Sequence, residues 1–508
     1  MNTPNNSPIE DPTSDHLSAR QEKLRRLRAK GIDPYPTKYR RSHTSTEARV
    51  LFNKTLETTD TTPTKTQPVS IAGRIMAVRI MGKNSFLDIK DGDGHIQAHF
   101  RVDTLGESYA LLKELDIGDF VGITGPIFKT RTGEVTIEAT EFTFLAKSLR
   151  SLPEKWHGLK DKEQRYRQRY LDLIANDEIM PVFLNRSRII QSIRTYMIKA
   201  GFVEVDTPVL VPVAAGALAK PFITRHHALG QNLYMRIATE LYLKRLIVGG
   251  FHKVFEIGRV FRNEGIDQNH NPEFTLLESY EAYANYEDVM RLVENLLSTV
   301  VHETTGENTI NYGDYTLDFS VPWRRMTFSN AILEYADIDL GPYLRSEKTI
   351  EHLISSAQDR GFDVQSGPPH QIFDKLLSLA VEPKLIQPTF ITDHPKIMSP
   401  LAKTKPGNPD IVERFEAFIG QMEIANAFSE LNDPEEQRNR FSEQEAIREK
   451  YSDEEADRTD DDFLTSLEYG MPPTGGLGIG IDRIIMLLTN QQSIRDILLF
   501  PQMRSRDT

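Results

Sequence analysis

Hydrophobic and polar residues alternate with a period of two over residues 68–147, in runs that turn residues separate. The runs VSIAGRIMAVRI, SFLDIK, HIQAHF, FVGITGPIF and EVTIEATEFTFL have the alternation of strands, and Gly, Asp and Lys occupy the gaps between them. Five short strands within about 80 residues predict a small closed β-barrel over residues 68–150.

The same alternation predicts which side chains point out of this barrel, which we expect to be of the OB type. Leu87 and Ile89 take the inward face, so Phe86 points outward, and the neighbouring runs expose Arg79 and Gln97. An exposed ring among such polar groups can stack on unpaired bases and hydrogen-bond to them. The pattern alone leaves open the alternative that Phe86 packs against another part of the chain.

A helical period precedes the barrel. Leu17, Leu24 and Leu27 share one face and Gly31 follows, which predicts a short basic helix at about 17–30. The flanks, 1–15 and 41–67, are rich in Thr, Ser, Asn and Pro, so residues 1–67 are expected to be a flexible extension around that helix. The basic helix could bind RNA phosphates or pack on the barrel, and both interpretations stay open.

After the barrel we expect a linker over 151–184, with the basic and aromatic stretch KDKEQRYRQRYLDLI, and a second domain over 185–508. Ile189, Ile193 and Met197 recur at helical spacing before Gly201, which predicts a helix over 185–200. Strand runs and helical runs then follow one another without a fixed repeat. The predicted fold class is α+β.

Composition excludes several classes of protein. The 508 residues carry a net charge of −12, from 61 basic and 73 acidic side chains, which argues against a uniformly basic nucleic-acid binder. Without cysteine the chain has no disulfide or thiolate site. The longest uncharged stretch, residues 207–219, is short and contains two prolines, and the N-terminus lacks a signal-peptide pattern. We therefore expect a cytoplasmic protein without membrane contact.

Residues 254–280 predict a hairpin in which VFEIGRVFRNE and EFTLLESY are paired strands. Alternation places Arg262 and Glu264 on one face of the first strand, and Phe274, Glu278 and Tyr280 on one face of the second. Unpaired buried charges cost several kcal/mol each, so this face meets water or lines a polar pocket. A guanidinium beside an aromatic ring suits a nucleotide, whereas an exposed ion pair is the alternative.

The stretch RFEAFIGQMEIANAFSELND predicts a second hairpin, turning at residues 420–421. Glu423 then lies opposite Phe418, on the same face as Glu416, and two close carboxylates favour a bound cation such as Mg²⁺. Strict alternation would direct three later residues of this segment to the other face. We predict a β-bulge near 424–425, which returns them to the side of Glu423. These residues are Asn426, Phe428 and Glu430.

Three segments, in order and spacing, resemble motifs 1, 2 and 3 of the class II aminoacyl-tRNA synthetases. They are GFVEVDTPVL, FRNEG with HNPEF, and GLGIGIDR. The finer matches YMRIATELYLKRL, HNPEFTLLE, QPTFITDHP, MSPLAK and ANAFSELNDP are similar to the lysyl-tRNA synthetases of this class, and the resemblance runs from about residue 17 to the end. Ala214, Ala215 and Thr239 depart from the family pattern near the expected substrate loop.

The resemblance implies an OB-fold anticodon-binding domain and a catalytic domain with an antiparallel sheet flanked by helices. It implies a homodimer joined through motif 1, where Pro208 lies, and the use of ATP with Mg²⁺ to activate L-lysine for transfer to tRNA(Lys). Two alternatives stay open. One is a tRNA-independent paralogue that lysylates a protein or lipid, and the other is an RNA-binding protein without activity.

The resemblance also implies roles for individual residues. ATP would be bound by Arg262, Glu264, His270, Asn271, Phe274, Glu416 and Arg483, of which Arg262 and Arg483 are the catalytic residues. Lysine would be bound by Gly216, Glu240, Arg262, Glu278, Tyr280, Asn426, Phe428 and Glu430. Mg²⁺ would be held by Glu416 and Glu423, and the anticodon would be read by Arg79, Phe86 and Gln97.

Overall fold

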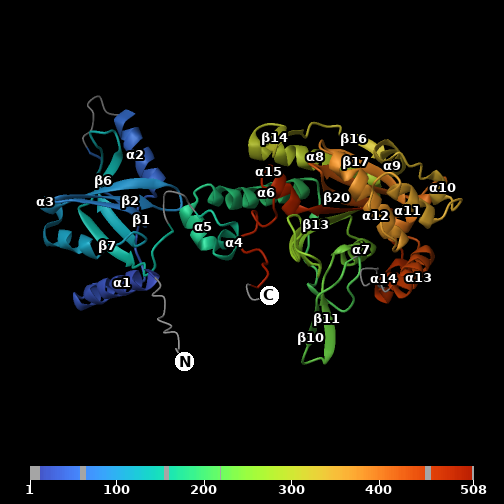
Figure 1. Ribbon diagram of the computed structural model, residues 1–508, viewed down its shortest axis with the longest axis horizontal. Coiled ribbons are helices and arrows are strands. Elements are labelled where there is room, and N and C mark those ends of the chain that lie inside the picture. Colours follow the sequence, from blue (N-terminus) through green and yellow to red (C-terminus); the bar gives the residue numbers. More distant parts are fainter. Residues whose placement is uncertain (1–11, 58–64, 154–158, 218, 452–458, 506–508) are drawn as a thin grey trace, which may run out of the picture. The chain divides into compact units, whose positions relative to one another are not determined.

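The computed structural model describes residues 12–57, 65–153, 159–217, 219–451 and 459–505 (Figure 1). Residues 1–11 of the expected extension and 453–458 of the acidic stretch lie outside the described residues. The chain divides into two compact units, residues 1–160 and 161–508. This division falls within the expected linker, whose later part forms the helices α4 (Lys162–Arg167) and α5 (Arg169–Ala175) of the second unit.

The first unit is built on a strongly curved sheet. Over the described residues it has seven strands in the order β5-β6-β3-β2-β1-β4-β7, two more than the alternation predicts, because the later runs each split at a turn. Backbone hydrogen bonds from Glu138 and Thr140 to Pro126 and Thr124 join the end of β6 to the β4–β5 region and close the barrel. The strands are β1 (Val69–Met81), β2 (Asn84–Lys90), β3 (His95–Arg101), β4 (Phe120–Gly125), β5 (Ile127–Lys129), β6 (Val135–Glu138) and β7 (Glu141–Ala146).

Two helices pack on this barrel. α1 (Pro12–Ala29) buries Leu27, and its Arg26 donates to Glu114 at 2.9 and 3.2 Å. At least one basic side chain of this helix is therefore paired with an acidic residue of the barrel. The flexible segment expected over 41–67 is wrong for its first half. It contains α2 (Ser45–Glu57), which buries Ala48 and Phe52 at helical spacing in the barrel core.

The second unit is organised by a large, mainly antiparallel sheet. Over the described residues its strands run in the order β16-β17-β19-β20-β21-β13-β12-β8, with β18 added beside β19. Only the outer pairs β16–β17 and β12–β8 are parallel. The strands are β8 (Val203–Glu204), β12 (Lys253–Phe261), β13 (Glu273–Ala282), β16 (Arg324–Thr327), β17 (Thr389–Pro395), β18 (Thr404–Lys405), β19 (Asn408–Ile419), β20 (Met422–Ser429) and β21 (Thr474–Gly480).

Helices cover the two faces of this sheet differently. α6 (Ile179–Lys199), α8 (Tyr286–Thr305) and α15 (Ile481–Leu488) pack on one face and form the largest apolar core. α6 begins six residues earlier than the sequence predicts. On the other face, two separate apolar clusters leave the middle of the sheet uncovered. One contains α9 (Phe328–Ala336), α10 (Gly341–Leu344), α11 (Ile350–Gln358) and α12 (Pro369–Ala380), and the other contains α7 (Glu240–Val248), α13 (Pro434–Tyr451) and α14 (Asp461–Glu468).

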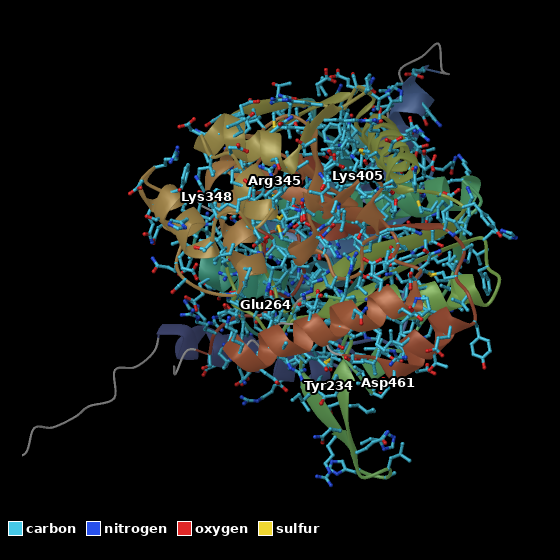
Figure 2. All side chains as sticks on the ribbon, turned by 90° about the vertical axis from the view of Figure 1, so that its right-hand side faces the viewer. Tyr234, Glu264, Arg345, Lys348, Lys405 and Asp461 are labelled. Atoms are coloured by element: carbon cyan, nitrogen blue, oxygen red, sulfur yellow. The ribbon has the colours of Figure 1, made fainter. Side chains whose placement is uncertain are left out.

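A small three-stranded sheet projects from this unit. β10 (Ile223–His226) and β11 (Gln231–Met235) form a hairpin that pairs with β9 (Leu210–Val211), and Figure 2 shows it extending beyond Tyr234 with its side chains in the open. A separate hairpin joins β14 (Thr309–Tyr312) to β15 (Tyr315–Asp318). Among the residues that the structure describes, no helix combines the length and apolar character needed to cross a membrane.

Candidate active site

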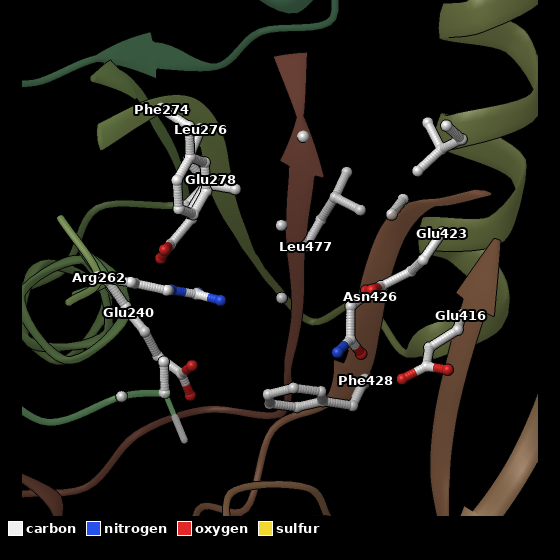
Figure 3. Close-up of a pocket in the computed structure, with 18 of the residues that line it drawn as sticks. Glu240, Arg262, Phe274, Leu276, Glu278, Glu416, Glu423, Asn426, Phe428 and Leu477 are labelled. Carbon is white, nitrogen blue, oxygen red and sulfur yellow. The ribbon is translucent and has the colours of Figure 1, made fainter. Parts of the chain in front are cut away.

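The uncovered middle of the large sheet forms a cavity of about 450 Å³. Its floor is made by β13, β21, β20 and β19, and the N-terminus of α7 and the loop after β12 form its walls. Figure 3 shows Glu240, Arg262 and Glu278 facing Glu423, Asn426 and Phe428 across the cavity. All of the residues to which the resemblance assigns roles toward ATP, lysine or Mg²⁺ line this one cavity: Gly216, Glu240, Arg262, Glu264, His270, Asn271, Phe274, Glu278, Tyr280, Glu416, Glu423, Asn426, Phe428, Glu430 and Arg483.

Arg262 and Phe274 form a cationic and aromatic pair at one end of the cavity. The guanidinium carbon lies 5.1 Å from the ring centroid. The expectation that Arg262 and Glu264 lie within a strand is wrong, because β12 ends at Phe261. One further backbone hydrogen bond, from Arg262 to Pro272, keeps Arg262 in register, while Glu264 lies exposed in the loop beyond it.

Arg483 reaches the same end of the cavity from the first turn of α15. It donates to the backbone oxygen of Glu423 at 2.6 Å and lies 3.4 Å from the Glu423 carboxylate. His270 approaches it at 3.5 Å, while the other ring nitrogen of His270 pairs with Asp267. Asn271 is buried and donates to the backbone oxygen of Glu273. Two guanidinium groups therefore flank a space beside an aromatic ring.

Glu416 and Glu423 lie on one face of the β19–β20 hairpin with different surroundings. Burial alone would raise the pKa of Glu416, but Arg414 at 2.5 Å and His394 at 3.3 Å lower it to about 2. Burial and the nearby Glu416 charge raise the pKa of Glu423. Glu416 is thus a fixed anion, and Glu423 is an anion that would gain from an additional cation.

The predicted β-bulge in β20 is confirmed. Ala417 pairs with Ala425 and Phe418 pairs with Glu423, so Ile424 has no partner of its own. Ile424 and Ala425 both contribute to the core on the opposite face. The extra residue returns the side chains of Asn426, Phe428 and Glu430 to the cavity.

Acidic groups dominate the other end of the cavity. Glu278 is buried and accepts a hydrogen bond from the backbone N–H of Thr239 at 3.1 Å. Burial and the charge of Glu240 raise the pKa of Glu278 to about 7. The hydroxyl of Tyr280 donates to Glu278 at 3.4 Å, and burial raises the pKa of this phenol well above its usual value.

Lys244 is a member of this acidic end that the sequence analysis does not single out. Its side chain is fully buried, its ammonium lies 2.5 Å from Glu240, and it also pairs with Glu430. Apart from this pair, neither oxygen of Glu430 has a hydrogen-bond partner among the described residues. A Cβ on Gly476 would lie 1.8 Å from Glu430, so only glycine leaves room for this carboxylate. Gly216, with φ +92°, packs against Glu240.

Two further carboxylates lie near Glu416 and Glu423 without having been predicted. Burial and the two glutamates raise the pKa of Asp374 to about 6, and burial and Glu423 raise that of Glu382 to about 7. Among the described residues, however, no group of three or more His, Asp or Glu side chains has the geometry to enclose a metal ion. A cation here would therefore need further ligands from a bound molecule or water.

The barrel carries a separate candidate site in the first unit. Phe86 is stacked on His99, with ring centroids 4.4 Å apart and an angle of 6° between the planes, and Phe128 lies beyond His99 at 6.0 Å. Arg79 pairs with Asp88 at 3.1 Å, and Gln97 accepts a hydrogen bond from Thr136. His99 stacks on one face of the half-buried Phe86 ring, and Arg79 is the cross-strand neighbour of Phe86 on β1. In the sequence, only the alternation of β3, which places His99 on the same outward face as Gln97, indicated that His99 could belong to this site.

Comparison with known proteins gives a consistent result for both units. Residues 161–504 match the family model described as tRNA synthetases class II (D, K and N), and residues 69–145 match the OB-fold nucleic acid binding domain. A lysine–tRNA ligase of Dehalococcoides mccartyi is 53% identical over 501 residues, covering 97% of this chain and 98% of that protein. Lysine–tRNA ligases of Pelotomaculum thermopropionicum and Listeria innocua are 50% and 52% identical, with coverage of 96% or more of each protein.

Proposed function

Because this chain belongs to the class II tRNA synthetases of the aspartate, lysine and asparagine group, we propose that it activates L-lysine with ATP and transfers it to tRNA(Lys). Relatives at about half identity over nearly the whole chain are lysine–tRNA ligases, and the chain carries out the same ligation. The family, the OB fold and the α+β catalytic domain expected from the sequence are confirmed.

The arrangement of charged and aromatic groups in the cavity is the main support for placing the reaction there. Two guanidinium groups, an aromatic ring and a pair of carboxylates meet at one end, and three further carboxylates meet at the other. The first set complements the adenine and phosphates of ATP. The second set complements a small molecule with two ammonium groups, and free lysine is such a molecule.

The first reaction needs positioning more than a strong base. A carboxylate oxygen of lysine attacks the α-phosphorus of ATP, the bond to the β-phosphate breaks, and pyrophosphate leaves with the released electron pair. Arg262 would hold the lysine carboxylate and the α-phosphate together, and Arg483 would neutralise charge on the leaving pyrophosphate. A terminal ribose hydroxyl of tRNA then attacks the lysyl carbonyl carbon, and AMP leaves.

Mg²⁺ fits the carboxylate pair. Glu416 is ionised by its neighbours, and Glu423 lies beside it with a pKa raised by burial and by that same charge. These two residues would hold the ion, with phosphate oxygens and water completing its ligands, as is usual for Mg²⁺ in nucleotide sites. When bound, the ion neutralises phosphate charge and orients the polyphosphate chain.

Selection of lysine would depend on the acidic end. Glu240 and the backbone at Gly216 would receive the α-amino group, and Glu278, Tyr280 and Glu430 would surround the ε-ammonium. Asn426 and Phe428 would form the side walls. An amino acid without the terminal ammonium would leave buried carboxylates unpaired, a mismatch that costs on the order of 10⁴-fold in selectivity.

tRNA would be read on the barrel, where the Phe86 ring, stacked on His99, would offer a stacking surface for an anticodon base. Arg79 and Gln97 flank it and can hydrogen-bond base edges. A barrel bearing this surface favours tRNA over a protein or lipid as the acceptor, which argues against a tRNA-independent paralogue.

A homodimer is supported by an exposed apolar surface around motif 1. Val203, Val209 and Leu210 are 40–49% exposed, and Ile223 and Leu229 of the projecting hairpin are about 65% exposed. Leu210 and Ile223 belong to the same small sheet, and exposed apolar surface commonly marks a protein interface. We expect the enzyme to act as a dimer in the cytoplasm, where its tRNA substrate is found.

Lysine-dependent exchange of pyrophosphate into ATP, followed by charging of tRNA(Lys), tests the proposal. We expect exchange with lysine but not with aspartate or asparagine, and charging of tRNA(Lys) by the same preparation. Exchange without charging would favour the paralogue that modifies a protein or lipid. Absence of exchange with all three amino acids would favour an inactive RNA-binding protein.

A further inference from the structure

A fully buried lysine side chain lies directly behind the acidic end of the cavity. Lys244 is the fifth residue of α7, and its ammonium pairs with Glu240 of the same helix and with Glu430 after β20. Its Nζ also lies 5.4 Å from the ring centroid of Phe428 and 5.8 Å from that of Phe463. It is thus enclosed by two carboxylates and two rings, and it does not line the cavity itself.

The net charge at this end of the cavity explains why a buried lysine side chain is needed there. Glu240, Glu278 and Glu430 are all buried at this end, and bringing three carboxylates together without a cation is strongly unfavourable. Lys244 neutralises the equivalent of one of them. The remaining two negative charges match the two ammonium groups of free lysine, while the lysine carboxylate is left for Arg262.

We propose that Lys244 is a positioning residue that determines specificity, because its ammonium holds Glu240 and Glu430 as a fixed, ionised pair, one for each ammonium of lysine. This inference rests on the proposed function, which places lysine in the cavity. Lys244 does not touch the substrate. It acts through the two carboxylates, one on each side of its ammonium.

The surroundings of Glu430 agree with this role. Burial raises the pKa of Glu430 well above its usual value, Lys244 opposes that shift, and Glu240 and Glu278 add to it. The titratable groups facing Lys244 and Glu430 are therefore Glu240 on α7 and Glu278 and Tyr280 on β13. Without the ammonium of Lys244, the pKa of Glu430 would rise further, and its ionised form would be less available to pair with a substrate ammonium.

The substitution Lys244→Met tests the proposal, because methionine keeps the length and removes the charge. In lysine-dependent pyrophosphate exchange we expect the KM for lysine to rise roughly 100-fold while the KM for ATP stays unchanged within about twofold. The KM for lysine should fall steeply as the pH is raised, because Glu430 must then ionise unaided. Lys244→Arg, which restores the charge, should recover part of the loss. A wild-type KM for lysine and a wild-type pH profile in Lys244→Met would overturn the proposal.

Lys147 of the barrel provides a matched control. It is equally buried and its ammonium lies 2.8 Å from Asp119, so Lys147→Met removes a comparable buried cation outside the catalytic unit. We expect it to lower stability and leave the KM for lysine unchanged. Lysine-dependent exchange by the wild type and by this variant tests the proposed function, independently of Lys244.

A double variant keeps the test decisive if Lys244→Met folds poorly. Lys244→Met combined with Glu430→Gln removes both charges of this pair, so no unpaired charge is left at position 430. Because Lys244 acts partly through Glu430, the double variant should lose less kcat/KM for lysine than the product of the two single-variant losses. Losses that multiply would show that Lys244 acts independently of Glu430 and would contradict the proposal.

Discussion

The two ends of the catalytic cavity differ in their charge and in their exposure to water. At the end with Arg262 and Arg483, cations lie among the carboxylates and the site is partly open to water, with the Glu423 side chain 37% exposed. At the end with Glu278 and Glu430, carboxylates outnumber cations, and the Glu430 side chain is fully buried.

The contrast indicates where each kind of selectivity arises. A partly hydrated end can neutralise a polyphosphate without demanding one shape of ligand, because water compensates imperfect contacts. A dry end makes every unmatched charge costly, so it accepts only a ligand that supplies the missing cations. Catalytic power should therefore depend mainly on the first end and amino-acid selection on the second.

The largest effect is expected from Arg262→Ala, which removes the fork between the lysine carboxylate and the α-phosphate. The rate of pyrophosphate exchange should fall about 1000-fold, as when one preorganised donor to a developing charge is lost. Arg345→Ala, at an exposed ion pair with Glu347, is the control and should be neutral. An exchange rate of Arg262→Ala within tenfold of the wild-type rate would contradict a catalytic role for Arg262.

Glu430→Gln should affect the kinetics for lysine, which depend on the acidic end of the cavity, but not those for ATP, which depend on the other end. We expect kcat/KM for lysine to fall about 100-fold, because an amide cannot compensate a buried ammonium, while the KM for ATP stays near wild type. Steady-state exchange kinetics with each substrate varied measures both. Glu468→Gln, at an exposed pair with Arg438, controls for the substitution itself. Unchanged lysine kinetics would reject the ammonium-binding role of Glu430.

Phe86→Ala tests the barrel independently of both ends. Loss of one base–aromatic stack should raise the KM for tRNA on the order of 20-fold in charging assays and leave pyrophosphate exchange unchanged. A large exchange defect would instead mean that Phe86 supports the fold. Phe128→Ala, which removes the ring beyond His99, should have a smaller effect because Phe128 does not touch Phe86 directly.

The smallest effect is a dependence of lysine affinity on pH. With the pKa of Glu278 near 7, the free enzyme carries a proton there at about pH 6, and lysine binding must release it. Affinity should therefore increase about tenfold between about pH 6 and about pH 8, measured by calorimetry. The free energy of unfolding without lysine should decrease as the pH rises through 7, because the unfolded carboxyl loses its proton earlier. Equal affinity at both pH values would contradict the raised pKa of Glu278. Glu278→Gln should make the lysine affinity nearly independent of pH.

Much of the fold and the site could be predicted from local patterns. Alternation predicted the buried residues of the barrel strands, and pairing about the turn at 420–421 predicted the positions of Glu416 and Glu423. The bulge followed from requiring Glu430 to reach the same face. These features depend on period and register, which short segments specify.

Features that depend on tertiary packing escaped prediction. Glu240 and Lys244 lie four residues apart on a helix, a spacing that usually indicates an exposed ion pair. They are buried because α7 packs over the sheet beside Phe463, which is far away in sequence. Likewise His394 lies on a different strand from Glu416, and only the β17–β19 pairing brings it there, whereas Arg414 lies two residues before Glu416 on β19 itself. α2 was missed because Ala48 and Phe52, which pack in the barrel core, lie within a segment whose flanks are polar.

The unpaired Ile424 has a consequence for how this chain can change in length. Insertion or deletion of one residue between 423 and 430 would exchange the two faces of the strand. Ala425 and Ala427 would then face the reactants, and Glu430 would be driven into an apolar core. A single-residue indel here should abolish activity where most substitutions only weaken it, so the spacing of this segment is as much a determinant of the enzyme as its residues.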